Sequence, residues 1–325
     1  MQRRCLKCMK IFNIPSGYEG EPFCCPFCGT VENPYQVIPY ALIKGTVLQN
    51  RYLIGDVIGF GGFGITYIAF DYINNKAVAI KEYYPRGVAG RISGNKVSRL
   101  STDGGVLFEE GRVRFIQEAK NLVRFNYLPG IVSIFDFFET NNTAYIVMEL
   151  LDGYNVKQII QKKGTPKIEF IYRMAEDICS VLGVIHAGGI IHRDISADNI
   201  FICRTGEFKL IDFGAARQSF MLNLKSSELI LKKGYAPVEQ YNVKGNIGPW
   251  TDIYALAVTM YIILTGRSIP EAISRSPGGN DIIPPGSFNP RIPKHLNDAI
   301  MKALSFYPQN RYQNAIEFRE EIMRR

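Results

Sequence analysis

The chain has 325 residues, of which 46% are hydrophobic and 21% are charged. This length and balance indicate a folded protein with one large core and a small appendage, and they exclude a disordered or fibrous chain. The formal net charge of +8 suggests an anionic partner. Because Lys and Arg are scattered along the chain, an enzyme that handles phosphate is favoured over a protein that binds nucleic acid.

The first residues carry no sign of a secretory signal, because residues 1–4 lead into Cys5 without an apolar segment. The longest apolar run, Ile253 to Leu264, is too short to cross a bilayer and is typical of a buried helix. We therefore expect a cytoplasmic protein without membrane contact.

Five of the seven cysteines lie within the first thirty residues. Cys5 and Cys8 form one C-x-x-C pair, Cys25 and Cys28 form a second, and Cys24 is left over. A two-residue spacer lets both sulfurs of a tight turn point at one ion, and two such turns complete a tetrahedron. The pattern predicts a structural Zn²⁺ site, and metal binding would supply the folding free energy of so short a segment.

A disulfide or free thiols are the alternative for these cysteines, disfavoured because we expect a reducing compartment. The segment resembles a zinc ribbon, a module that elsewhere binds nucleic acid or protein, and the sequence does not say which. We assign residues 1–30 to this module and the irregular residues 31–50 to a linker. Cys179 and Cys203 lie in apolar stretches and are expected to be buried.

Strands are predicted from Tyr52 onward, on either side of a glycine cluster. Residues 59–64 read Gly-Phe-Gly-Gly-Phe-Gly and contain G-x-G-x-x-G, a weak signal because dinucleotide-binding folds share it. Here a second strand follows the glycines instead of a helix, which favours a hairpin lid over phosphates. Phe63 at the tip is expected to shield the site from water.

The segment Val78-Ala79-Ile80-Lys81 places a cation at the end of a strand, where it can hold the α- and β-phosphates of a nucleotide. Its partner should be a carboxylate on the next helix, and the helical stretch from Val113 to Phe125 offers Glu118. Together with the glycine hairpin, these residues resemble the N-terminal lobe of a protein kinase.

The stretch between Lys81 and Glu118 is long and glycine-rich, and it resembles an inserted loop. A solvated excursion without function and a regulatory or substrate-docking segment are both open.

Residues 144–153 resemble the strand and hinge that join the two kinase lobes. By that resemblance Met148 is the gatekeeper, and the Glu149 carbonyl and Leu151 amide bond the adenine edge. The residues expected to contact ATP are Ile58, Gly59, Gly61, Gly62, Phe63, Gly64, Thr66, Ala79, Lys81, Met148, Glu149, Leu151 and Phe201.

Residues 190–199 read Ile-Ile-His-Arg-Asp-Ile-Ser-Ala-Asp-Asn, and Asp212-Phe213-Gly214 follows after a pair of predicted strands. The two motifs at this separation are the strong signal for a kinase. The resemblance implies that Asp194 accepts the proton of the substrate hydroxyl, while Asn199 and Asp212 hold the Mg²⁺ ions that bridge the phosphates of ATP.

Arg193 beside the catalytic aspartate can bind a phosphate on the activation segment. An unphosphorylated, constitutively ordered segment is the alternative. The candidate phosphorylation sites are Ser219, Ser226 and Ser227.

Several further residues are expected to support the scaffold. Glu239 should form a buried ion pair with Arg311, and Asp252 should anchor the backbone of the catalytic loop. His192 is expected to pack under Phe213.

Ser/Thr kinases normally carry a lysine two residues after the catalytic aspartate, where it contacts the γ-phosphate, and this chain has Ser196 there. The threonine usual near the end of the activation segment aligns with Lys232. Our hypothesis is that the two side chains are exchanged, with Lys232 as a catalytic residue that supplies the missing charge. A solvated loop lysine is the alternative.

The resemblance covers residues 51–325, and the motif wording is similar to that of bacterial members of the eukaryotic-like (Hanks-type) Ser/Thr protein kinases. It implies an α+β, bilobal protein kinase fold, with a β-rich N-lobe of about 51–150 and a larger helical C-lobe of about 151–325, preceded by the zinc ribbon. The implied activity is transfer of the ATP γ-phosphate to Ser/Thr hydroxyls of proteins, with autophosphorylation.

Two other classes of protein share part of this pattern. A pseudokinase scaffold that binds nucleotide and acts through the zinc module is supported only by Ser196. A small-molecule kinase is disfavoured by residues 234–239 and by the helix that carries Asp252, which belong to a peptide-binding lobe.

Overall fold

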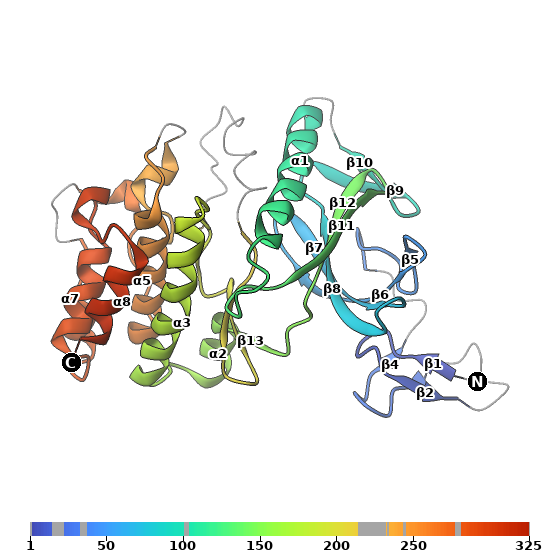
Figure 1. The fold of residues 1–325 in the computed structure, drawn as a ribbon, viewed down its shortest axis with the longest axis horizontal. Coiled ribbons are helices and arrows are strands. Elements are labelled where there is room, and N and C mark those ends of the chain that lie inside the picture. Colours follow the sequence, from blue (N-terminus) through green and yellow to red (C-terminus); the bar gives the residue numbers. More distant parts are fainter. Residues whose placement is uncertain are drawn as a thin grey trace. The chain divides into compact units, whose positions relative to one another are not determined.

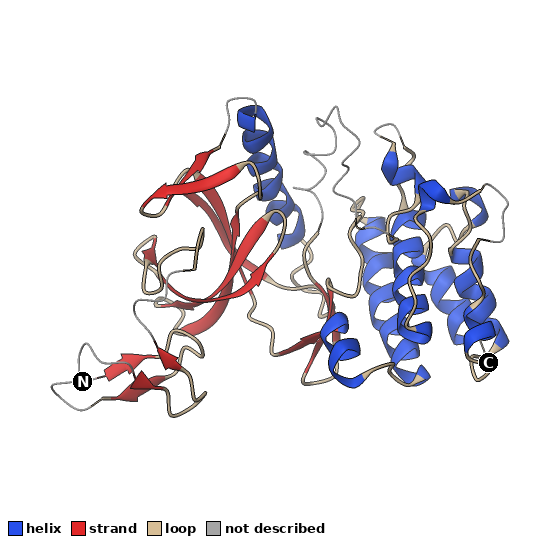
Figure 2. Ribbon diagram, turned by 180° about the vertical axis from the view of Figure 1, so that it is seen from behind, coloured by secondary structure: helices blue, strands red, loops and turns tan. Residues whose placement is uncertain are grey.

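The computed structural model describes residues 2–14, 23–32, 38–100, 104–213, 232, 234–242, 245–276 and 281–324. The chain forms two compact units. Unit 1 consists of Met1–Arg124 and Ser133–Leu151, and unit 2 consists of Phe125–Val132 and Asp152–Arg325. Strands predominate in unit 1 and helices in unit 2 (Figures 1 and 2). The predicted combination of a β-rich part and a larger helical part is confirmed.

Two short hairpins begin unit 1. Strand β1 (Gln2–Arg4) pairs antiparallel with β2 (Ile11–Asn13), and β3 (Phe23–Cys24) pairs antiparallel with β4 (Val31–Glu32). Each C-x-x-C pair lies in the connection between the two strands of a hairpin. Both cysteine pairs are therefore placed in tight turns, as their spacing predicts.

The core of unit 1 is an antiparallel sheet of six strands in the order β11-β12-β8-β7-β6-β5. Their β-branched and aromatic residues suit a pleated, buried surface, and all six residues of β12 are buried. The strands are β5 (Val47–Leu48), β6 (Tyr52–Phe60), β7 (Gly64–Asp71), β8 (Lys76–Tyr83), β11 (Ile134–Thr140) and β12 (Thr143–Met148).

Part of the predicted linker belongs to this sheet. Strand β5 pairs with β6, and the buried Leu42 donates its backbone N–H to the Tyr67 hydroxyl at 3.0 Å. This strand was missed from the sequence for two reasons. Residues 31–50 contain prolines that are typical of a linker, and a two-residue strand is too short to show an alternating pattern. The sheet therefore starts before residue 51.

Within the inserted stretch, the described residues form a hairpin and a helix. Strands β9 (Ala89–Ser93) and β10 (Lys96–Arg99) pair antiparallel, and α1 (Gly104–Val123) follows. Val97 in β10 donates its backbone N–H to the carbonyl of Asn141 at 2.8 Å. A solvated excursion is therefore wrong for residues 89–99, and the helix starts earlier than Val113.

Unit 2 is built around α5 (Pro249–Thr265), in which every residue from Thr251 to Tyr261 is buried. This is the apolar run that the sequence predicts as a core helix. The other helices are α2 (Val156–Lys163), α3 (Ile168–Ala187), α6 (Pro285–Phe288), α7 (Lys294–Ala303) and α8 (Ala315–Met323), with 3₁₀ turns η1 (Val238–Tyr241), η2 (Ala272–Ser274) and η3 (Pro308–Asn310).

A small sheet completes unit 2. Its strands β13 (Gly153–Asn155), β14 (Ile200–Cys203) and β15 (Phe208–Leu210) lie in the order β13-β14-β15. The strand pair β14–β15 is the one predicted between the catalytic loop and Asp212. The catalytic loop that ends at Asn199 directly precedes this hairpin, and Asp212 lies just after it.

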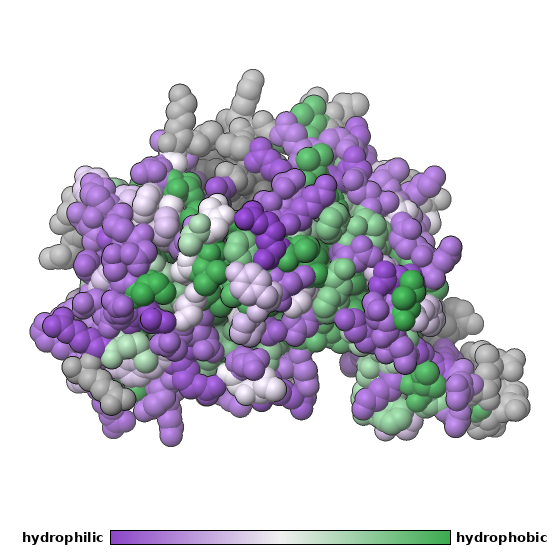
Figure 3. All heavy atoms as spheres, in the orientation of Figure 1, coloured by the Kyte–Doolittle hydropathy of each residue, from purple (hydrophilic) through white to green (hydrophobic). Residues whose placement is uncertain are grey.

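The surface in Figure 3 shows mostly hydrophilic residues with hydrophobic ones interspersed. Among the helices of the described residues, none is both long and apolar enough to cross a membrane.

Candidate functional site

Hydrogen bonds from its backbone to Asp252 of α5 hold the predicted catalytic loop. Asp252 accepts the backbone N–H of His192 at 2.8 Å and that of Arg193 at 2.7 Å. Its Oδ2 also lies 2.8 Å from Nε2 of His186. Asp252 has no solvent exposure, so this anchor is shielded from competing water, as the sequence predicted for Asp252.

Within the loop, Asn199, a predicted Mg²⁺ ligand, holds Asp194, the predicted base. Asn199 is 7% exposed, and its Nδ2 donates to the backbone carbonyl and to Oδ2 of Asp194, both at 2.8 Å. An amide that donates twice fixes the rotamer of the carboxylate it contacts. Asp194 is therefore oriented before any substrate arrives, which is what positioning catalysis requires.

His192 lies against Phe213, with ring centroids 4.2 Å apart. The imidazole is completely buried, and burial lowers its pKa. It is therefore neutral at pH 7 and acts as an apolar support for Phe213, as predicted.

Two predicted functional residues adopt left-handed backbone conformations. Arg193 has φ of 65° and Asp212 has φ of 56°. Such φ values are uncommon outside glycine and cluster at sites where the surrounding structure imposes them. Arg193 lies in the loop that Asp252 anchors. Asp212 follows the last residue of β15 by two positions.

In unit 1, strand register puts four of the predicted nucleotide-contact residues on one face of the sheet. Lys81 pairs with Thr66, and Ala79 pairs with Met148. Residues directly opposite each other, and residues two apart on one strand, share a face. The Lys81 ammonium lies 6.0 Å from the ring of Phe115, one helical turn before Glu118 on α1. The ion pair between Lys81 and Glu118 stays a prediction.

The glycine cluster forms the turn between β6 and β7. Gly61 donates its backbone N–H to the carbonyl of Gly64 at 2.9 Å, and Arg86 donates to the carbonyl of Gly62 at 2.9 Å. A Cβ at Gly64 would lie 2.6 Å from the carbonyl oxygen of Glu82. Gly64 is thus required by the close approach of β7 and β8, whereas Gly61 and Gly62 are exposed.

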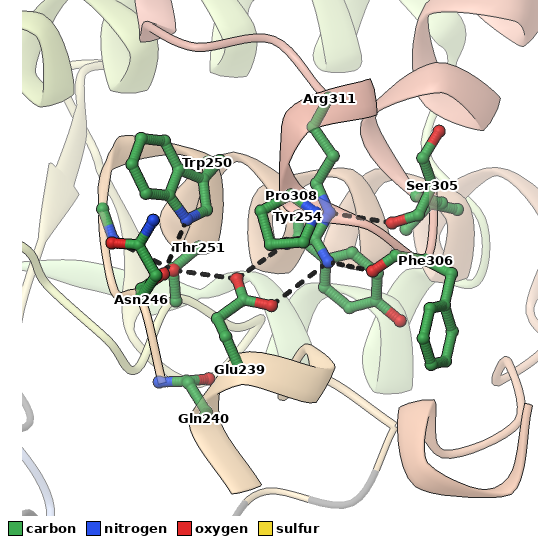
Figure 4. A network of polar contacts seen from close by, with 12 residues as sticks. Glu239, Gln240, Asn246, Trp250, Thr251, Tyr254, Ser305, Phe306, Pro308 and Arg311 are labelled. Atoms are coloured by element: carbon green, nitrogen blue, oxygen red, sulfur yellow. Dashed lines mark hydrogen bonds and ion pairs between the residues drawn. The ribbon is translucent and has the colours of Figure 1, made fainter. Parts of the chain in front are cut away.

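The predicted ion pair at the end of the activation segment is present (Figure 4). Arg311 Nη1 lies 2.7 Å from Oε1 of Glu239, with side-chain exposures of 0% and 4%. The same carboxylate oxygen accepts the Thr251 hydroxyl at 2.9 Å, and Arg311 also donates to the carbonyls of Ser305 and Phe306. The pair ties η1 to α5 and to the segment before α8.

Lys232 reaches the catalytic loop. Its ammonium donates to Oγ of Ser196 at 2.7 Å and to the carboxylate of Asp198. The Lys157 ammonium lies 3.0 Å from the other oxygen of Asp198. Burial opposes ionisation of Asp198, but these two ammonium groups outweigh it and lower the pKa of the carboxyl.

At the N-terminus, the four predicted cysteine ligands converge. The sulfur atoms of Cys5, Cys8, Cys25 and Cys28 all lie within 4.8 Å of one another. The Cys5–Cys28 and Cys8–Cys25 sulfur pairs are each 3.7 Å apart, and Zn–S bonds of about 2.3 Å in a tetrahedron require sulfurs about 3.8 Å apart. The donor set and its spacing therefore fit a Zn²⁺ ion. Cys24 is outside the cluster.

The cysteine module packs on the six-stranded sheet, a contact that sequence reasoning missed. Met9 joins a cluster with Ile68 and Phe70 of β7, and Asp56 of β6 donates its backbone N–H to the Leu6 carbonyl at 2.8 Å. The Arg4 guanidinium lies 3.3 Å from the Phe70 ring centroid. The cysteine spacing predicts the metal ligands, but it does not predict which surface of the protein the module packs against.

A buried network beside Lys81 was also missed. Glu82 has no exposure; its carboxylate lies 2.7 Å from Arg91 and accepts the hydroxyls of Tyr67 at 2.7 Å and Tyr145 at 2.9 Å. Cross-strand pairing puts these groups on the sheet face opposite Lys81. The available signal was a second charged residue, directly after Lys81, inside a buried strand.

Some predicted residues lie outside the described part of the chain. They are Gly214 and the candidate phosphorylation sites Ser219, Ser226 and Ser227. The assignment of Arg193 to a phosphate therefore stays a prediction. So do the predicted contacts with ATP of Ile58, Gly59, Gly61, Gly62, Phe63, Gly64, Thr66, Ala79, Lys81, Met148, Glu149, Leu151 and Phe201, and the predicted binding of Mg²⁺ by Asn199 and Asp212.

The chain is similar to known proteins. The protein kinase domain model matches residues 52–313. This match covers most of the chain, which therefore belongs to the protein kinase family. The predicted kinase fold and its eukaryotic-like, bacterial character are confirmed.

Individual relatives agree with this assignment. The chain is 32% identical over 291 residues to the serine/threonine-protein kinase PknB of Mycobacterium leprae, covering 85% of this chain and 43% of that protein. It is 31% identical over 287 residues to a probable serine/threonine-protein kinase of Clostridium acetobutylicum, covering 86% and 40%. Thus it spans about two fifths of the length of these curated relatives. A solved structure of PpkA-294 in its apo form superposes with a TM-score of 0.80 at 34% identity, covering 87% of this chain and 99% of that chain.

Proposed function

We propose that this chain is an ATP-dependent kinase that phosphorylates Ser and Thr hydroxyls of proteins, itself included. The observation that carries the proposal is the prearranged loop in which Asn199 holds the Asp194 carboxylate while Asp252 holds the loop backbone. Membership of the protein kinase family and similarity to bacterial serine/threonine-protein kinases support the same reaction.

In this reaction the substrate oxygen forms a bond to the γ-phosphorus while the bond from that phosphorus to the β,γ-bridging oxygen breaks. The hydroxyl proton passes to the Asp194 carboxylate, and ADP is the leaving group. Lys81, oriented by Glu118, binds the α- and β-phosphates. Asn199 and Asp212 would hold Mg²⁺, which would neutralise charge on the phosphates.

The test is transfer of radiolabelled phosphate from Mg-ATP to the chain itself and to a generic basic protein, followed by phosphoamino-acid analysis. We expect labelled phosphoserine or phosphothreonine that Asp194→Asn abolishes. This substitution keeps the size of the side chain and removes its ability to accept the proton. ATP binding without any transfer by the native chain would contradict the proposal and favour a scaffold that binds nucleotide.

We propose further that the N-terminal module binds one structural Zn²⁺ through Cys5, Cys8, Cys25 and Cys28. The fit of their sulfur spacing to a tetrahedron supports this. Four thiolates leave no open coordination position, so the ion would stabilise the module and take no part in phosphate transfer. We place the protein in the cytoplasm, where reduced thiols persist.

A further inference from the structure

We propose that Lys232 is a catalytic residue whose ammonium binds the γ-phosphoryl group during transfer, and that Ser196 is the positioning residue that holds it there. This inference rests on the proposed function. It starts from a chemical requirement, because transfer of a phosphoryl group needs cations where charge gathers in the transition state. The catalytic loop, residues 192–199, contains two aspartates and no lysine.

The structure brings one ammonium to this loop from elsewhere in the chain. Lys232 lies 36 residues after Ser196, and its Nζ donates to Oγ of Ser196 at 2.7 Å. Ser196 follows Asp194 by two residues and has no exposure. The Lys232 ammonium is therefore held two residues from the proposed base, Asp194. The Ser196 hydroxyl that holds it is buried and cannot turn toward solvent.

The Lys232 backbone and side chain are both held. Its carbonyl accepts the backbone N–H of Tyr235 at 3.0 Å, and its ammonium lies 5.4 Å from the Tyr235 ring centroid. A long lysine side chain held in this way loses little further entropy when it contacts a phosphate.

The local charge balance leaves a cation available. Among the described residues, Asp198 is the one carboxylate that contacts the Lys232 ammonium, and its other oxygen lies 3.0 Å from the Lys157 ammonium. One carboxylate shared by two ammonium groups leaves one positive charge. The Lys232 side chain is 28% exposed, so its ammonium can still reach a ligand. It acts through its charge and forms no covalent bond.

The contrasting possibility is that Lys232 is a structural link to Asp198. Lys157 supplies the matched control, because it contacts the same carboxylate and its side chain is 54% exposed on α2. If Lys232 served only to neutralise Asp198, Lys157→Met and Lys232→Met would have similar effects on the rate.

The experiment measures kcat, the KM for ATP and thermal unfolding in the full chain. We expect Lys232→Met to lower kcat about 100-fold with a KM for ATP within about three-fold, since the charge acts mainly in the transition state. Lys157→Met should leave kcat within about three-fold. Ser196→Ala should lower kcat in the native chain and have no further effect in Lys232→Met, because both changes remove one interaction.

The exchange variant, Ser196→Lys with Lys232→Ser, decides the matter even if a single variant is unstable. Recovery of kcat to within about ten-fold of the native value would support a cation at the loop, whichever residue carries it. An unchanged rate in Lys232→Met, or equal losses in Lys232→Met and Lys157→Met without recovery in the exchange variant, would overturn the assignment while the proposed function stands. A native chain without any transfer would overturn both.

Discussion

At the scale of single residues, unit 2 contains a buried ion pair between Arg311 and Glu239. Arg311 and Glu239 are almost fully buried, and each satisfies the other at 2.7 Å. The sequence resemblance predicted this pair although its members lie 72 residues apart. Removing one member would leave the other charged and without its main partner in a site that excludes water.

We predict that Arg311→Met lowers the free energy of unfolding by about 3 to 5 kcal/mol, the usual cost of breaking a buried pair. Chemical denaturation monitored by far-UV circular dichroism measures the change. The double variant Arg311→Met with Glu239→Leu removes both charges and should lose less than the single variant. A double variant that loses more than the single one would contradict this account.

At the scale of elements, the β9–β10 hairpin is attached to the sheet by the buried pair of Arg91 and Glu82. Arg91 is 7% and Glu82 is 0% exposed in their side chains. Glu82 directly follows Lys81, so the hairpin braces β8 from the sheet face opposite the lysine. The same hairpin also carries an exposed pair, Arg99 with Glu109, at side-chain exposures of 51% and 39%.

These two arginines give a matched comparison on one hairpin. Arg91→Met should lower the free energy of unfolding by about 3 kcal/mol, because among the described residues it leaves the buried Glu82 carboxylate with only the hydroxyls of Tyr67 and Tyr145 as partners. Arg99→Met should cost at most about 0.5 kcal/mol, because water screens the exposed pair. Denaturant titration of both variants measures the difference, and equal effects would show that the hairpin is not attached through Arg91.

At the scale of the whole molecule, the cysteine module and the sheet of unit 1 form one connected structure. The module contributes Met9 to a cluster with Ile68 and Phe70, and Leu150 after β12 packs against the same cluster. Its Leu6 carbonyl holds the Asp56 amide of β6. If the module loses its metal, we therefore expect the sheet to lose stability as well as the module.

We predict one Zn²⁺ per chain by atomic absorption, with loss of the ion in Cys28→Ser and retention in Cys24→Ser. Cys24 is the control because it adjoins Cys25 but lies outside the sulfur cluster. Chelation should unfold the module, which has too small a core to fold without metal. Hydrogen exchange of the Asp56 amide should then become faster. Exchange that is unchanged by chelation would mean that the contact with β6 persists without the ion.

The sequence by itself determined the family, the order of the motifs and the four cysteines that the fold brings together. These features are contiguous or closely spaced, as in C-x-x-C, the glycine turn and the loop from His192 to Asn199, so local geometry alone gives them their meaning. The buried helix α5 was equally predictable, because a long apolar run must avoid water. The linker and the insert were not, because short strands and glycine-rich hairpins have weak periodicity.

Only the tertiary structure decided which distant residues meet. The pairing of Lys232 with Ser196 was a hypothesis from alignment alone, and the fold brings the two within hydrogen-bond distance. The pairing of Arg91 with Glu82 and the packing of Met9 on β7 had no counterpart in any motif. Contacts of this kind depend on how strands register and how elements pack, and the burial that makes them strong exists only once the chain has folded.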